Sequence, residues 1–142
     1  MRNIYLLDTN IISQVTKPEP SPNILTKLEL NVGTCAISSI TWFELLNGVN
    51  LLPEGAKKEK LSSFLIDYVQ PSFPIIPYDS HAASINADIT SRLSHIGKPT
   101  PILDTQIAST AIANNLILVT SNTKDFQIFT EHFNLMLEDW AL

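Results

Sequence analysis

The sequence predicts an α/β fold, with a mainly parallel sheet and helices on both of its faces. Apolar segments that are too short for helices alternate along the chain with longer segments whose apolar residues recur at helical spacing. Polar residues, proline and glycine separate these segments. Such alternation is typical of chains in which each strand is followed by a helix that packs on the same sheet.

The length and composition favour a single cytoplasmic domain that covers residues 1–142. A chain of 142 residues has the ordinary size of one domain. Its one cysteine, Cys35, lies in an expected strand and cannot form an intrachain disulfide, which favours a reducing compartment. The apolar run near the start covers only residues 4–7, too few for a signal peptide or a membrane helix, so no membrane association is expected.

The first half of the chain is expected to hold two strands and four helical segments. Residues 4–7 are all apolar and predict a buried strand that ends at Asp8. A helix that begins at about residue 11 should end at the proline-rich segment 18–22, because proline lacks the backbone amide hydrogen. The other expected elements are a helix over 24–30, a strand over 34–37, an amphipathic helix that is capped by Ser38 and Ser39 and contains Trp42, Leu45, Leu46 and Val49, and a helix over 57–69.

The second half is expected to continue the same alternation. Residues 73–78 are apolar but contain two prolines, which predicts an edge strand. A helix over 80–95 should end with Gly97 in the C-terminal cap position. Thr100 and Pro101 are expected as the cap and the first residue of the next helix. That helix should run to about residue 114, followed by a buried strand over 116–120 and an edge strand over 134–137.

The net charge of −5 argues against a broad nucleic-acid surface, since such a surface needs Lys and Arg to neutralise phosphates. If the substrate is RNA, the acidic residues must be concentrated where a cation can offset them.

Asp8 is the first candidate for such a site, because it directly follows the first strand. Active sites of parallel α/β sheets lie outside the carboxyl ends of the strands. The same position also suits an aspartate that only caps a helix or forms a turn, so this residue alone leaves both interpretations open.

Two further acids lie near the beginnings of expected helices. Asp104 shares a helical stripe with Ile107 and Ala111 that should face the sheet, and a carboxylate placed there needs a partner such as a cation. Glu44 borders the apolar stripe of its own helix, although Thr41 and Glu44 also have the spacing of a capping box. For both acids, a site role and a structural role remain open.

Taken together, Asp8, Glu44 and Asp104 are expected at one edge of the sheet. Clustered carboxylates repel one another unless a divalent cation keeps them ionised. Oxygen ligands suit Mg²⁺ or Mn²⁺, and no cluster of Cys and His points to zinc. A few carboxylates that share a metal ion with water and substrate phosphates are typical of enzymes that cleave phosphodiester bonds.

Four segments resemble, in order, the motifs of PIN-domain nucleases. Residues 6–13 (LLDTNIIS) resemble the opening motif, and residues 38–49 (SSITWFELLNGV) resemble the second. Residues 97–108, from Gly-Lys-Pro to Asp-x-x-Ile-Ala, resemble the third motif. Residues 118–126 (LVTSNTKDF) resemble the closing motif, and Trp140 matches a tryptophan that is frequent near the end of these proteins.

The resemblance implies a three-layer α/β/α sandwich in which Asp8, Glu44 and Asp104 are the catalytic metal ligands. It also implies an endoribonuclease that depends on Mg²⁺ or Mn²⁺, forms a homodimer and is inhibited by a small antitoxin protein. The small, undecorated chain favours the toxin branch of the family, the VapC/FitB type.

The chain departs from the common pattern at the fourth acidic position. Asn122 stands where many members have Asp and others have Asn, and it is expected to orient water or to bind phosphate. Asp125 is a secondary candidate that could replace the missing acid through water. Thr9, Asn10 and Thr120 are expected to support the ligands by hydrogen bonds.

Two other functions remain open. One is a DNA or structure-specific nuclease of the same fold outside a toxin pair, and the other is a non-catalytic binding module. The intact set of three acids argues against the binding module. Arg92, Lys98 and Lys124 are the candidates for contacts with backbone phosphates, whereas the three histidines are expected at the surface.

Overall fold

Five parallel strands form the centre of the computed structural model, which describes residues 2–142. The strands are β1 (Tyr5–Leu7), β2 (Cys35–Ser38), β3 (Ile75–Ile76), β4 (Ile117–Val119) and β5 (Met136–Glu138). Their order is β3-β2-β1-β4-β5, and every pairing is parallel. The predicted parallel sheet is therefore confirmed, and β3 and β5 are edge strands as expected.

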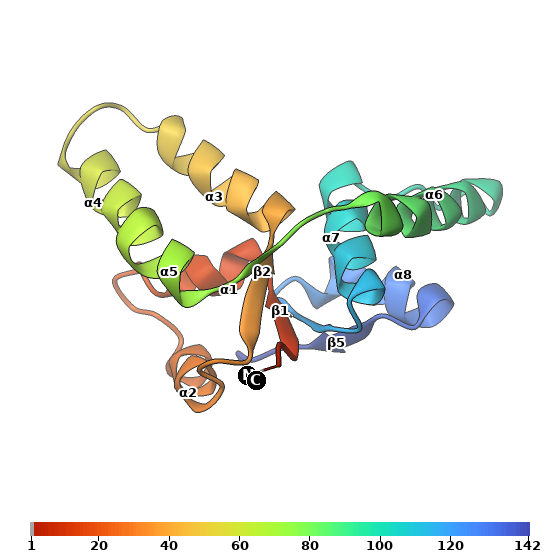
Figure 1. Cartoon of the computed structure of the whole chain (residues 1–142), viewed down its shortest axis with the longest axis horizontal. Helices are drawn as coiled ribbons and strands as arrows, with labels where there is room; N and C mark the ends of the chain where they lie inside the picture. The colour runs from red at the N-terminus through yellow and green to blue at the C-terminus, as the bar shows by residue number, and fades with distance from the viewer. Residues whose placement is uncertain (1) are drawn as a thin grey trace.

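Helices cover both faces of the sheet (Figure 1). They are α1 (Thr9–Gln14), α2 (Pro22–Leu30), α3 (Ser39–Asn50), α4 (Ala56–Phe64), α5 (Gln70–Ser72), α6 (Ser80–His95), α7 (Ile102–Ala113) and α8 (Thr123–Phe133). The helix expected over 57–69 is α4 followed by a wider, π-helical turn, η1 (Leu65–Val69), which leads into α5. Within residues 2–142 no helix has both the length and the apolar character that a bilayer crossing requires.

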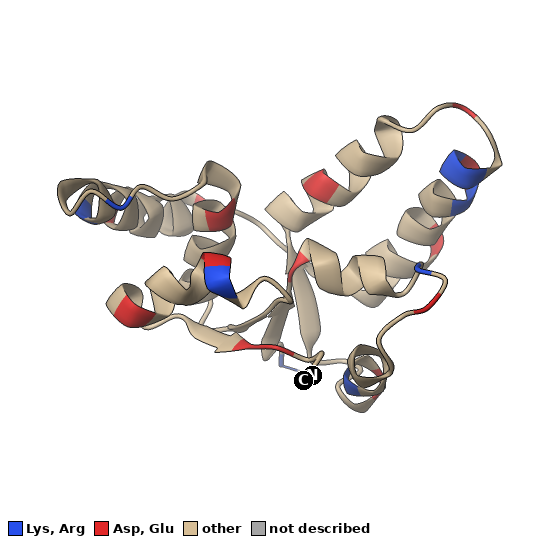
Figure 2. Cartoon of the chain, turned by 180° about the vertical axis from the view of Figure 1, so that it is seen from behind, with Lys and Arg blue, Asp and Glu red and all other residues tan. Residues whose placement is uncertain are grey.

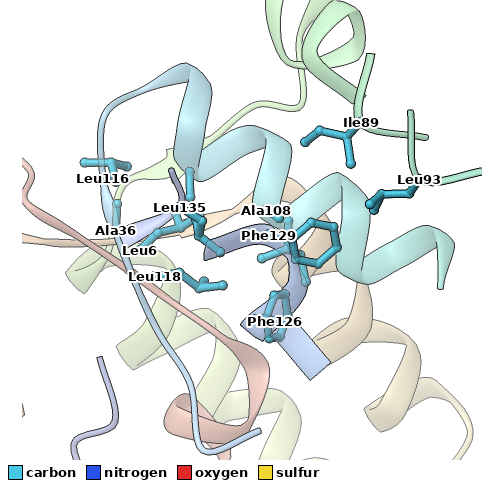
Figure 3. Close-up of a cluster of buried hydrophobic side chains, with 12 residues drawn as sticks. Leu6, Ala36, Ile89, Leu93, Ala108, Leu116, Leu118, Phe126, Phe129 and Leu135 are labelled. Atoms are coloured by element: carbon cyan, nitrogen blue, oxygen red, sulfur yellow. The ribbon is translucent and has the colours of Figure 1, made fainter. Parts of the chain in front are cut away.

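The molecule has two hydrophobic cores, one on each face of the sheet, because the side chains of each strand point alternately to the two faces. Leu6 and Leu7 are both fully buried, but they contact opposite layers of helices, because successive side chains of a strand point to opposite faces. Figure 3 shows the first core, in which Leu6 lies with Leu118 of β4 and with Phe126 and Phe129 of α8. Residues of α6 and α7 complete this layer.

The second core lies between the sheet and the helices of the first half of the chain. Leu7 packs there with Ile11 of α1, Leu45 of α3 and Val69 of η1. Trp140 closes this core near the C-terminus, where it is 2% exposed and its indole Nε1 donates to Glu138 Oε1 at 3.0 Å. Burial of each large apolar side chain contributes about 1.5–3 kcal/mol, so both layers are held firmly against the strands.

The helix ends show which local predictions were correct. Ser38 caps α3, since its Oγ accepts from the amide of Thr41 at 3.0 Å. The expectation for Ser39 was wrong, because its hydroxyl accepts from the amide of Tyr78 instead. Gly97 has a φ of +69° and ends α6 as predicted, a conformation that favours glycine.

The predicted cap of α7 was wrong by one residue. The helix begins at Ile102, and Pro101, with extended backbone, occupies the cap position without any side-chain hydrogen bond. The hydroxyl of Thr100 lies 2.6 Å from that of Thr105, so a contact with the helix interior replaces the expected cap.

The carboxyl end of β1 lies at the topological switch point of the sheet, where the order of the strands reverses. The chain passes from β1 to β2 on one side, whereas β4 pairs with β1 on the other side. The loops that follow β1, β2 and β4 therefore leave the same edge next to one another. In open parallel sheets, ligands bind at such a point.

Candidate active site

Asp8 lies at the carboxyl end of β1 and is only 6% exposed. Its Oδ1 accepts from the amide of Thr9 at 2.8 Å and so caps α1. Its Oδ2 accepts from Thr120 Oγ1 at 2.8 Å and from Asn10 Nδ2 at 3.4 Å. The helix-cap interpretation is thus correct, and the same carboxylate is also held at the sheet edge by residues of α1 and of the loop after β4.

Glu44 reaches this edge from α3. Its Oε1 accepts from Thr9 Oγ1 at 2.8 Å, a contact between residues 35 positions apart. The capping-box interpretation of Thr41 and Glu44 was wrong, because Ser38 is the cap of α3. The Thr41 hydroxyl is buried and stands out as having no hydrogen-bond partner within the described chain.

Asp104 comes from the opposite layer, in the first turn of α7, and it is half-buried. An acid in a first turn is stabilised by the helix dipole, but only by about 0.3–1 kcal/mol. The two ion pairs found between residues 2 and 142, Lys58–Glu54 and Arg92–Asp88, lie elsewhere. Asp104 therefore has no ion-pair partner that offsets its partial burial.

One cavity of about 310 Å³ brings the three acids together. Its wall consists of Asp8, Thr9, Asn10, Ser13, Lys17, Glu44, Asp104, Asn122 and Phe126. Eight of these nine side chains are polar or charged, so the cavity suits water, ions or a polar ligand better than an apolar one.

The electrostatics of the cavity favour a cation. Burial raises the pKa of Asp104 to about 6, and repulsion from Asp8, Asp125 and Glu44 adds to the shift. Burial likewise raises the pKa of Asp8 and of Glu44, against the lowering effect of their hydrogen bonds to Thr120 and Thr9. Each carboxylate would thus be easier to keep ionised with a positive charge among them.

The supporting residues join the two sides of the cavity. Asn10 donates to Thr120 Oγ1 at 3.2 Å and accepts from the amide of Ser121 at 3.0 Å, which ties α1 to the loop after β4. Asn122 lines the cavity, and its side chain is not used to cap α8. Asp125 is exposed on the first turn of α8 and does not line the cavity, although its charge raises the pKa of Asp8 and Asp104.

The donor set fits a hard divalent cation. Carboxylate, amide and hydroxyl oxygens surround the cavity, and these are the ligands that Mg²⁺ and Mn²⁺ prefer. Across residues 2–142, however, no three Asp, Glu, His or Cys side chains are close enough to hold one ion directly. Mg²⁺ usually keeps several of its waters and binds through one or two carboxylates, so this wider spacing is compatible with it.

Sequence reasoning missed three residues of the cavity wall as site residues: the polar Ser13 and Lys17, and the apolar Phe126. The basic residues that it favoured, Arg92, Lys98 and Lys124, are not part of this wall. Arg92 pairs with Asp88 at 3.2 Å on α6 and lies over the ring of Phe133. Lys17 follows the short helix α1, which Asp8 caps, and only the path of that helix in space brings it to the acids.

Comparisons with known proteins identify the family and the fold of the chain. Residues 5–130 match the family model described as PIN domain. The chain is 37% identical over 126 residues to Toxin FitB of Neisseria gonorrhoeae, and this alignment covers 87% of this chain and 91% of the relative. It is 31% identical over 137 residues to the tRNA(fMet)-specific endonuclease VapC of Shigella flexneri, covering 96% of this chain and 98% of the relative.

A solved structure, described as FitAB bound to an IR36 DNA fragment, has a similar fold. It superposes with a TM-score of 0.88 at 30% identity, over 98% of this chain and 96% of that chain.

Proposed function

The chain belongs to the PIN-domain family, and we propose that it is a metal-dependent endoribonuclease that acts as the toxin of a toxin–antitoxin pair. The observation that carries the proposal is the meeting of Asp8, Glu44 and Asp104 at one cavity, each with a raised pKa. Such an arrangement costs stability unless a ligand compensates for it.

Asp8, Glu44 and Asp104 are the residues that would hold a Mg²⁺ or Mn²⁺ ion, one or two of them directly and the rest through water molecules bound to the ion. When bound to carboxylates, such an ion polarises a phosphodiester and lowers the pKa of a water molecule. The chain contributes rigidity: Thr120 and the Thr9 amide fix the Asp8 carboxylate, and the Thr9 hydroxyl fixes that of Glu44. Asn122 adds a neutral amide at the cavity, suited to orient water or to bind a phosphate oxygen.

A protein nucleophile is not part of the proposed mechanism. Burial raises the pKa of the Cys35 thiol to about 11, so the thiol is protonated at neutral pH. Cys35 lies at the beginning of β2, whereas the three acids lie beyond the carboxyl ends of the strands. The reaction therefore has the form of a direct hydrolysis by water.

The names of two relatives support RNA as the substrate and toxicity as the outcome. The Shigella flexneri relative is named as a tRNA(fMet)-specific endonuclease, and the Neisseria gonorrhoeae relative is named as a toxin. The identities of 31% and 37% over most of both chains make it reasonable to transfer the reaction class. The particular RNA does not follow from them.

The antitoxin part of the proposal has its own structural support. A second cavity, of about 320 Å³, lies between α1, α3 and α4 and adjoins the acidic one, since Thr9, Ser13 and Glu44 line both. Its other side chains are largely apolar, with Leu45, Val49, Leu52, Leu61, Phe64 and Leu65 among them. An antitoxin segment with an apolar face and a basic residue would fill this cavity and reach the acids. A homodimer in the cytoplasm completes the proposal.

The test of the reaction is cleavage of RNA by the purified protein. Total tRNA and a mixed-sequence single-stranded RNA are each incubated with millimolar Mg²⁺ or Mn²⁺ and, in parallel, with excess EDTA. We expect cleavage only with the metal ion, because the three acids need a cation to act together. Cleavage that is undiminished in EDTA would contradict metal dependence.

A matched DNA of the same sequence separates the proposed function from its alternatives. Equal cleavage of DNA and RNA would favour a general nuclease outside a toxin pair. Binding of RNA without any cleavage would favour a non-catalytic module.

A further inference from the structure

Lys17 stands out because it is the only basic residue in the wall of the acidic cavity. It lies in a turn that directly follows α1, and the backbone of this turn is well fixed. The amide of Thr16 donates to the carbonyl of Ser13, and the amide of Lys17 donates to the carbonyl of Gln14 at 3.2 Å. The following Pro18 restricts the backbone of Lys17 further. The position of this lysine relative to Asp8, at the start of α1, is therefore largely determined.

The ammonium group of Lys17 does not serve as the counterion of the acids. Neither of the two ion pairs that the described residues form includes it. The pKa values of Asp8, Glu44 and Asp104 are raised by burial and by repulsion from neighbouring carboxylates, and Lys17 is not among the groups that lower any of them. Its charge is thus at the edge of the cavity and is available to a ligand.

The other basic residues are not part of the wall of the acidic cavity, and Lys57 lines the adjoining apolar cavity instead. In the view of Figure 2, Lys and Arg are few, and a group of them lies at the beginning of α4. Lys58 of that group is paired with Glu54, and Arg92 is paired with Asp88. A polyanion that approaches three carboxylates in a chain of net charge −5 is repelled, so a nearby cation matters more here than on a basic protein.

We propose that Lys17 is the substrate-positioning cation of this site, and that its ammonium binds a backbone phosphate oxygen of the RNA strand beside the phosphodiester that is cleaved. A lysine acts on phosphate as a flexible point charge with several N–H donors, which suits a strand whose bases are not recognised. The proposal deepens the proposed ribonuclease function and rests on it.

The experiment measures binding of a fluorescein-labelled, mixed-sequence single-stranded RNA by anisotropy over a series of KCl concentrations. All proteins carry Asp104→Asn, so that the RNA stays intact, and Mg²⁺ is present throughout. Lys17→Gln is compared with Lys17→Arg and with Lys27→Gln, which removes an exposed lysine of α2 outside the acidic cavity.

For Lys17→Gln we expect the Kd to rise by roughly fivefold to tenfold at low salt. The slope of log Kd against log salt should fall by about 0.7, the value for one phosphate contact on a single strand. Lys17→Arg should keep most of the affinity, because the positive charge is retained. Lys27→Gln should leave the slope nearly unchanged.

Steady-state cleavage by proteins that retain Asp104 gives a second readout. A contact made equally in the ground state and the transition state raises KM and leaves kcat unchanged, which is the result expected for Lys17→Gln. Thermal melting should show the same stability for all lysine variants, since Lys17 is exposed.

Three outcomes overturn the proposal. If Lys17→Gln binds RNA with the same Kd and salt slope as Lys27→Gln, Lys17 does not contact the substrate. If RNA binding is unchanged but the affinity for the antitoxin falls, Lys17 belongs to the protein interface instead. If the mixed-sequence RNA binds to none of the variants, and the protein that retains Asp104 cleaves neither this RNA nor total tRNA, the proposed function fails together with this assignment.

Discussion

Replacing Asp104 by Asn is expected to reduce RNA cleavage by about 10³-fold or more. The loss of one ligand from a divalent-metal site removes several kcal/mol of transition-state stabilisation, and each 1.36 kcal/mol corresponds to a factor of ten in rate. Asn retains the size and most of the hydrogen-bonding capacity of Asp, so the helix and the cavity should stay intact. Single-turnover cleavage with saturating protein and Mg²⁺ measures the effect.

The same substitution should stabilise the metal-free protein at neutral pH. The pKa of Asp104 is raised from 3.8 to about 6, so the folded state binds more protons than the unfolded state between these values. Stability is then lost as the pH rises through this window, and the loss is complete above it. Because Asp104 is only half-buried, solvent screening reduces the contribution of Asp104 to this loss of stability to roughly 1 kcal/mol.

Urea denaturation in EDTA at about pH 4 and about pH 7.5 tests this prediction against a matched control. The free energy of unfolding of the wild type should decrease from the lower pH to the higher pH. For Asp104→Asn the decrease should be smaller. Asp67→Asn, which changes an exposed acid of η1, should behave like the wild type. A drop in the stability of Asp104→Asn at neutral pH would mean that Asp104 makes a structural contact that outweighs the repulsion.

Expression of this chain alone in a bacterial host is expected to arrest growth, and co-expression of its antitoxin is expected to restore it. A ribonuclease with an open, preformed site damages cellular RNA unless a partner covers the site. The apolar cavity between α1, α3 and α4 offers a place for the apolar side chains of such a partner. Stable interfaces bury about 800 Å² per side, so the partner must also cover the surface around this cavity. Colony counts after induction measure the effect, which should span several orders of magnitude.

Asp8→Asn provides the control for this experiment, because it should remove toxicity while the protein is still produced. The amount of soluble protein is compared by immunoblot. If the wild type is harmless at a level at which it is soluble and abundant, the chain is not a toxin, although a nuclease of another kind remains compatible with its site.

Much of the site could be predicted because the rules that place it depend on topology. A parallel sheet collects the carboxyl ends of its strands at one edge, so an acid directly after β1 is expected to meet side chains of the helix that follows β2 and of the loop that follows β4. The first turn of α7 lies at this edge too, because α7 leads into the beginning of β4 at the opposite edge. The structure does bring Asp8, Glu44 and Asp104 to one cavity. Their role as metal ligands remains a prediction.

The local predictions failed where a distant residue competed for the same group. Glu44 has the right spacing from Thr41 for a capping box, but Thr9, 35 residues earlier, offers its hydroxyl to Glu44. Ser39 could cap α3, but the amide of Tyr78 engages it. Spacing along the chain cannot reveal such contacts, because they arise only after the sheet has formed.

The basic residues show the same limit of prediction from the sequence alone. Arg92 looked suitable for phosphate from its sequence, yet its guanidinium is engaged by Asp88 and by the ring of Phe133 at 4.9 Å. Lys17 directly precedes the proline-rich segment 18–22 and was not singled out from the sequence, yet the turn after α1 brings it to the cavity. A charge pattern identifies candidates, but the three-dimensional path of a loop decides which charge is free.

The most direct test of the account is a calorimetric titration of the purified protein with Mn²⁺, since the central claim is that Asp8, Glu44 and Asp104 together hold a divalent cation. We expect saturable binding by the wild type and by Asp67→Asn at neutral pH. Binding should be lost, or weakened by about tenfold or more, in Asp8→Asn and in Glu44→Gln. If these two variants bind Mn²⁺ as tightly as the wild type, the three carboxylates do not form the metal site, and the proposed mechanism is wrong.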